Sequence, residues 1–257
     1  MNFAFIKISV GELGPGATSL LRAIGMMIVL LAASIFTKKN LEYPEGKMKD
    51  YLWAGFLANG LYMVLFLEGM LRASAIQGAI VISTAPIWVG GVAILTKHEL
   101  FTWRLLIGGL IACTGAACVT IGGGGDTEGS RIGGALVFVS AIVWAWSVIK
   151  MREIVEGRPA LEVFTLAFPA GFIALVPYGI VSAFQLDYAA VSWEAWGSLL
   201  YMVFFAGSMA FALYYVGLSQ VGPSKTAMTQ FFIPPVAALG AWIVLAKTPT
   251  TLQVIGV

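Results

Sequence analysis

Charged residues are scarce in this sequence, and their scarcity excludes most classes of soluble protein. Only 11% of the 257 residues are charged, whereas soluble domains average about 25%. Hydrophobic residues make up 59%, and the mean hydropathy is +0.90. One water-soluble core cannot hide so much apolar surface. A net charge of +2 without a basic block also excludes a nucleic-acid binder. An integral membrane protein, embedded in the lipid bilayer, remains.

Residues that carry chemistry are equally few. The only histidine is His98, and it does not form HExxH because Thr102 occupies the last place. Cys113 and Cys118 lie in one apolar run and point to different helix faces, which suits neither a disulfide nor a metal site. The GxxxxGK[ST] loop of ATP-driven proteins is absent from the sequence. We therefore expect no catalytic residue, no metal and no cofactor.

Long apolar runs dominate what is present. A helix needs about 20 mostly apolar residues to cross a bilayer. Eight runs meet this requirement: Ala17–Phe36, Tyr51–Leu71, Ala73–Thr96, Arg104–Gly122, Ile132–Lys150, Ala160–Phe184, Trp196–Gln220 and Thr226–Leu245. Residues 1–10 resemble the end of a further helix, and residues 251–257 resemble the start of another. We expect eight complete helices and two partial ones, as in a fragment of a longer chain.

The distribution of lysine and arginine predicts an orientation, because cytoplasmic loops are enriched in both. One set of alternate loops holds ten of these residues, and the other set holds five. This places the 37–50 loop in the cytoplasm. The loop Gln185–Ala195 then lies outside, where Tyr188, Trp193 and Trp196 suit an aromatic belt at the membrane interface.

The two halves of the chain resemble each other. Four consecutive glycines at 122–125 begin a linker-like segment. We expect a first repeat at 1–122, a linker at 123–131 and a second repeat at 132–257. Pro86 and Gly108 in the first half correspond to Pro235 and Gly256 in the second. With five helices in each half, the repeats would be inverted across the membrane, as in transporters. Helices interrupted at matching positions, here by Pro86, Pro234 and Pro235, point to the binding site.

Several stretches resemble a known family. They are 66–75 (FLEGMLRASA), 85–88 (APIW), 97–102 (KHELFT), 214–218 (YYVGL), 221–224 (VGPS), 233–236 (IPPV) and 252–256 (LQVIG). The chain resembles the EamA-type branch of the drug/metabolite transporter superfamily along essentially its whole length. The resemblance implies ten helices in two inverted repeats, a bacterial cytoplasmic (inner) membrane and export or exchange of small metabolites. One departure is a Gly-Glu pair of the family, which reads His98-Glu99 in the first half but Ala246-Lys247 in the second.

Polar and aromatic residues at helical spacing are the candidates for substrate binding, because such groups at membrane depth usually face a cavity or a partner helix. We select Asn59, Tyr62, Gln77, Thr84, Trp88, Trp144, Tyr215 and Gln230. Together they would suit an amphipathic metabolite such as an amino acid. The alternative is that they form hydrogen bonds between helices.

Two charged residues add alternatives. Arg22 either attracts an anionic substrate group or extends toward the lipid headgroups. Glu68 either pairs with Arg72 one turn later or couples transport to protons.

A stripe of small residues at Gly108, Ala112 and Ala116 suits close helix packing and leaves a homodimer open. The sequence thus predicts a secondary transporter that works by alternating access. A non-transporting or degraded relative is the main alternative, and an intramembrane lipid-modifying enzyme is a weaker one.

Overall fold

A computed structural model describes residues 2–39, 41–73, 78, 81–100, 102–103, 106–111, 114–115 and 130–232. All regular secondary structure in these residues is helical. Five helices are long and apolar enough to cross a membrane: Phe5–Phe36, Met48–Arg72, Arg131–Val155, Ala160–Gln185 and Trp193–Val221. A shorter apolar helix covers Val81–Leu95. The expectation of an all-helical fold with long apolar helices is confirmed for the described residues. Most of the expected spans at 104–122 and 226–245 lies outside the described residues, so the count of ten helices stays a prediction.

The first helix, α1 (Asn2–Phe36), is broken at Gly14. Gly14 has a φ of 75° and a ψ of 160°, a left-handed conformation that glycine adopts readily. Pro15 follows and opens the second part of the helix, where its missing N–H costs nothing. The break explains why the sequence shows residues 1–10 and Ala17–Phe36 as separate runs.

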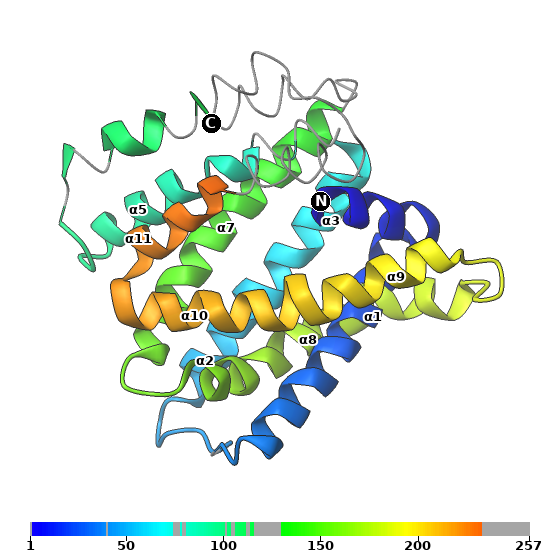
Figure 1. Cartoon of the computed structure of the whole chain (residues 1–257), viewed down its shortest axis with the longest axis horizontal. Coiled ribbons are helices and arrows are strands. Elements are labelled where there is room, and N and C mark those ends of the chain that lie inside the picture. Colours follow the sequence, from blue (N-terminus) through cyan, green and yellow to red (C-terminus); the bar gives the residue numbers. More distant parts are fainter. Residues whose placement is uncertain are drawn as a thin grey trace.

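Two of the spans contain a stretch of π-helix. The first span consists of α2 (Met48–Gly55), η1 (Phe56–Leu61) and α3 (Tyr62–Arg72), of which η1 is π-helical. The other consists of α9 (Trp193–Tyr201), π-helical η2 (Met202–Met209) and α10 (Ala210–Val221). Figure 1 shows the latter span as one long rod across the front of the molecule. Because π-helical turns are rare and are often found at functional sites, these segments direct attention to their neighbours.

The remaining helices complete the bundle. Helix α7 (Arg131–Val155) begins after Ser130, whose side chain accepts a hydrogen bond from the N–H of Gly133 and caps the helix. Helix α8 (Ala160–Gln185) packs along α1 and along η1. Helix α5 (Ala85–Leu95) lies beside α11 (Pro223–Met228), which continues into the 3₁₀ turn η3 (Thr229–Phe232) (Figure 1).

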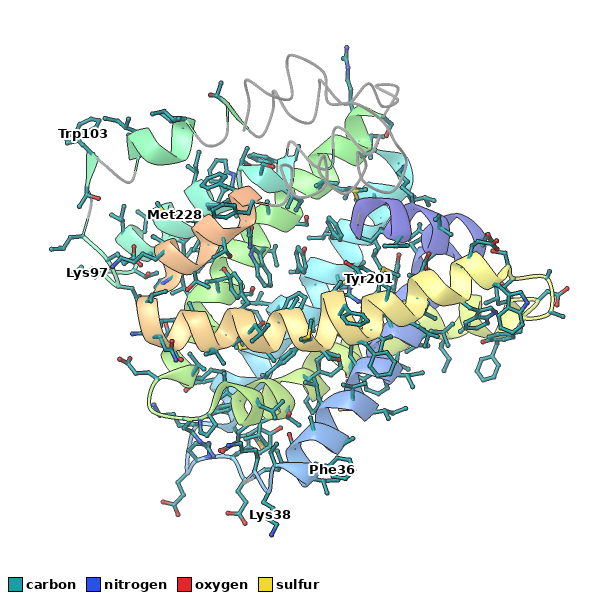
Figure 2. The ribbon with its side chains drawn as sticks, in the orientation of Figure 1. Phe36, Lys38, Lys97, Trp103, Tyr201 and Met228 are labelled. Atoms are coloured by element: carbon teal, nitrogen blue, oxygen red, sulfur yellow. The ribbon has the colours of Figure 1, made fainter. Side chains whose placement is uncertain are left out.

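Most basic residues gather at one end of the bundle, here called the basic end. Contacts between segments tie this end together: His98 lies 3.9 Å from Glu153, and Arg152 donates to the carbonyl oxygen of Leu218. Figure 2 shows Phe36 and Lys38 together at the tip of α1. The members are Lys38, Lys39, Lys47, Lys49, Lys97, Lys150, Arg152, Arg158 and Lys225. The helix order thus brings together the loops that the sequence grouped by charge, although Arg104 lies outside the described residues.

Candidate functional site

A cavity of about 510 Å³ lies between α1, α3, α7, η2 and α10. We call it the central cavity. Tyr201, one of the residues around it, lies near the middle of the view in Figure 2, away from Phe36 and Lys38. The lining consists of Ile6, Arg22, Tyr62, Met63, Phe66, Ile82, Ala85, Trp144, Tyr201, Met202, Phe205, Ala206, Met209, Ala210, Phe211, Tyr214 and Gln230. Its volume and mainly apolar lining are typical of small-molecule sites.

Trp144 of α7 stands at the centre of an aromatic wall. Its ring centroid lies 5.1 Å from that of Tyr62, 5.4 Å from that of Phe211 and 5.5 Å from that of Tyr214. Phe211 and Tyr214 are three residues apart on α10 and therefore share a helix face. The wall thus joins α3, α7 and α10 across the cavity with rings that can stack on a planar or apolar group.

Three polar atoms of the cavity lining have no hydrogen-bond partner in the described part of the chain. They are Nε1 of Trp144, the hydroxyl oxygen of Tyr214 and Oε1 of Gln230, and all three are buried. Leaving a buried donor or acceptor unsatisfied costs about 1–3 kcal/mol, so such groups are normally paired. All three belong to residues that line the central cavity, so two donors and an amide acceptor lie beside it without a partner among the described residues.

Arg22 of α1 also faces the central cavity, and only 7% of its surface is exposed. Its Nε donates to the carbonyl oxygen of Met202 at 3.4 Å, and its Nη1 lies 3.0 Å from the sulfur of Met63. No salt bridge to Arg22 occurs among the described residues. The side chain therefore does not extend toward the lipid headgroups, which was one of the two sequence interpretations. An arginine at membrane depth costs about 2.5–3.5 kcal/mol on insertion scales, so it is rarely placed there without a role.

The structure brings together four of the ten binding and charge candidates. Tyr62, Trp144, Gln230 and Arg22 line the central cavity. Gln77, together with Pro234 and Pro235, lies outside the described residues. Thr84 is a turn residue before α5, and Pro86 lies in the first turn of α5.

Four other candidates lie away from the cavity. Thr84 and Trp88 bond to each other, with 3.0 Å between the hydroxyl oxygen and Nε1. Tyr215 is buried against Phe164 at 5.0 Å between centroids. Asn59 is buried within η1, and its Nδ2 has no partner in the described residues. None of these four side chains forms a hydrogen bond to another helix among the described residues, because Thr84 and Trp88 bond within one segment and the hydroxyl of Tyr215 has no partner there either.

Glu68 does not line the central cavity. One carboxylate oxygen pairs with Arg72, as the spacing predicted, and the other accepts a hydrogen bond from the hydroxyl of Tyr178 on α8. Sequence reasoning missed Tyr178, because nothing in the spacing of the two helices links them. The cluster ties α3 to α8 at the end of the bundle opposite the basic end.

The sequence also missed Phe211, Tyr214 and the η2 residues of the lining. The spacing of the aromatic residues 211 and 214 could have predicted that they share a helix face. Nothing in the sequence of η2 indicated that its residues line the cavity. Among the described residues, no group of three His, Cys, Asp or Glu side chains could hold a metal ion.

Comparison with known proteins agrees with this architecture. The sequence matches the EamA-like transporter family over residues 1–121 and 131–257. The uncharacterised transporter YetK of Bacillus subtilis is 23% identical over 257 residues, which cover 98% of this chain and 77% of YetK. A probable terminal-alkyne amino-acid exporter of Streptantibioticus cattleyicolor is 23% identical, over 98% of this chain and 84% of its own. A crystal structure at 14% identity superposes with a TM-score of 0.76, covers 99% of this chain and 92% of its own, and shows a shared fold. The chain is therefore a multi-pass membrane protein that belongs to the EamA-like transporter family.

Proposed function

We propose that this protein is a secondary transporter that exports a small organic metabolite, an amino acid or a related compound, across the bacterial cytoplasmic membrane. The central cavity carries the proposal. It combines an aromatic wall around Trp144 with unpaired polar atoms on Trp144, Tyr214 and Gln230. A molecule that is apolar along its body and polar at its ends matches this lining.

Two further observations support the proposal. The relatives are named as transporters, and one of them is named as a probable exporter of terminal-alkyne amino acids. The basic end would face the cytoplasm, in line with the enrichment of lysine and arginine on that side of membranes.

Transport would follow from two repeats that rock around the central cavity. We propose a first repeat at 1–122, a linker at 123–131 and a second repeat at 132–257, with inverted topology and ten helices in the whole fold. A π-helical segment in each of two spans, η1 and η2, is compatible with this symmetry. A gradient would supply the driving force. If that gradient is one of protons, Glu68, which accepts a hydrogen bond from Tyr178, is the candidate for proton coupling.

Flux measurements test the proposal. The protein is reconstituted into lipid vesicles, and uptake of a panel of labelled amino acids and N-acylated amino acids is compared with uptake by protein-free vesicles. We expect saturable flux of at least one compound, and we expect Gln230→Ala to reduce it. Gln220→Ala is the matched control, because Gln220 is exposed and lies outside the cavity. Absence of flux across the panel, or normal flux in Gln230→Ala, would contradict the proposal.

A further inference from the structure

The described lining of the central cavity carries charge of only one sign. Arg22 is the only charged side chain among its described lining residues, which include no aspartate, glutamate, lysine or histidine. The described lining therefore carries one positive charge and no negative charge to balance it. Since an unbalanced charge at membrane depth is unfavourable, a bound anion would balance the charge of Arg22.

Arg22 keeps most of its hydrogen-bonding capacity free. A guanidinium has five N–H donors, and two contacts are made here. The contact with the Met202 carbonyl oxygen is long, at 3.4 Å, and the sulfur of Met63 is a weak acceptor. Nη2 has no partner among the described residues. These contacts hold the guanidinium at the wall of the cavity and leave N–H groups that can donate to two oxygens of one ligand.

The surroundings of Arg22 suit a carboxylate with an apolar body. Arg22 contacts Met63, which follows Tyr62 on α3, and Tyr62 lies against Trp144. A ligand held at Arg22 would therefore extend along the aromatic wall. The side chain of Gln230 borders the same cavity and offers its unpaired Oε1 to a hydrogen-bond donor elsewhere on the ligand.

We propose that Arg22 binds the carboxylate of the transported molecule and that the cavity selects organic monocarboxylate anions. This inference rests on the proposed transport function and narrows its substrate class. No acidic side chain in the described lining can pair with an ammonium group, so the proposal makes the carboxylate the charged group that the cavity recognises. Arginine suits the role because its planar fork matches a carboxylate bidentately.

Acid and ester pairs test the proposal on the unmodified protein. Four probes share the phenylalanine side chain and differ in which end is charged: N-acetyl-L-phenylalanine, its methyl ester, L-phenylalanine and L-phenylalanine methyl ester. Binding to the purified protein is measured by titration and by the shift of the thermal unfolding midpoint. We expect N-acetyl-L-phenylalanine to bind at least as tightly as L-phenylalanine and roughly 30-fold or more tightly than its ester, as expected for a buried charge pair.

Variants assign this preference to Arg22. In Arg22→Gln the acid and its ester should bind alike, and Arg22→Lys should recover part of the preference. Arg131→Gln removes the same charge from an exposed position outside the cavity and should keep the full preference. If Arg22→Gln does not fold, the comparison of wild type with Arg22→Lys decides.

Three results would overturn the proposal. The first is equal binding of N-acetyl-L-phenylalanine and its ester by the wild type, and the second is a preference for the acid that survives in Arg22→Gln. The third concerns a series of acids of increasing size, from acetate to N-acetyltryptophan, each compared with its methyl ester: no acid in the series binds more tightly than its ester. Flux of neutral or cationic compounds that depends on Gln230 would overturn the role of Arg22 while it upholds the transport function. If no tested compound is either transported or bound by the wild type, the proposed transport function itself is contradicted.

Discussion

The carboxylate of Glu99 accepts a hydrogen bond of 3.0 Å from the backbone N–H of Ser224 at the start of α11. The two residues are far apart in the sequence, and their contact joins the end of α5 to α11. An acceptor at a helix N-terminus satisfies a backbone donor and complements the helix dipole. This hydrogen bond gives a structural reason for an acidic residue at position 99, after His98. Lys247, which occupies the corresponding place in the second half, has donors only and cannot cap a helix in this way.

Replacing Glu99 should destabilise the fold without a direct effect on the cavity. We expect Glu99→Ala to lower the free energy of unfolding by about 1 kcal/mol. Glu99→Gln keeps an amide oxygen as acceptor and should lose less. Chemical unfolding in detergent measures the change, with the exposed Glu45→Ala as control. Equal stability of Glu99→Ala and Glu45→Ala would show that the contact contributes nothing.

Close packing of η1 on α8 should make glycine indispensable at Gly171. A Cβ at this position would lie 2.5 Å from the Cβ of Asn59 and 2.7 Å from the carbonyl oxygen of Gly55. We expect Gly171→Ala to cost about 1–3 kcal/mol through overpacking. Gly134→Ala on α7 meets no atom within 4 Å and should be neutral or slightly stabilising. The prediction fails if the thermal unfolding midpoints of the two variants do not differ.

Arg158 should stabilise the basic end by neutralising a buried acid. Its guanidinium pairs with Glu162, whose side chain is only 6% exposed, and donates to the hydroxyl of Tyr51 at 3.1 Å. Arg158→Met leaves the carboxylate buried and unpaired, at an expected cost of about 2–3 kcal/mol, somewhat below that of a fully buried pair. The double variant Arg158→Met/Glu162→Leu should recover most of this loss. A double variant no more stable than Arg158→Met would contradict the explanation.

Tyr43, in the loop before α2, should make stability depend on pH in alkaline solution. Its hydroxyl donates to the carbonyl oxygen of Leu166 at 2.9 Å, and burial raises the pKa of the phenol. Above about pH 10, where an exposed tyrosine ionises, the folded state binds more protons than the unfolded state, so stability falls as pH rises. Tyr43→Phe should weaken this fall above about pH 10. Identical pH profiles of the unfolding midpoint in the two proteins would refute the assignment.

The sequence predicted the membrane spans well because bilayer insertion demands long apolar runs, which composition alone reveals. Five of the expected runs coincide with described helices of spanning length. The break at Gly14 and Pro15 was also predictable as the gap between two runs, since both residues interrupt helices.

The binding residues were harder to predict because π-helical turns alter the angular position of side chains. Asn59, Tyr62 and Phe66 share a face only if the whole segment is α-helical. Residues 56–61 are π-helical, and each such turn holds more residues than an α-turn. Asn59 is therefore rotated away from the face that carries Tyr62 and Phe66 to the cavity. Residues 131–155 are α-helical throughout, and Trp144 of this helix lines the cavity.

The central claim is that the cavity around Trp144 binds the transported molecule, and one comparison of variants tests it most directly. Uptake into vesicles is measured for the wild type, Trp144→Ala and Trp193→Ala, for a compound that the wild type transports. Trp193 is 88% exposed at the start of α9 and serves as the control. The account predicts that Trp144→Ala lowers uptake about tenfold or more, which corresponds to a loss of about 1.4 kcal/mol or more in the free energy of substrate binding. Uptake by Trp193→Ala should be unchanged. Uptake by a folded Trp144→Ala protein at the wild-type rate would contradict it.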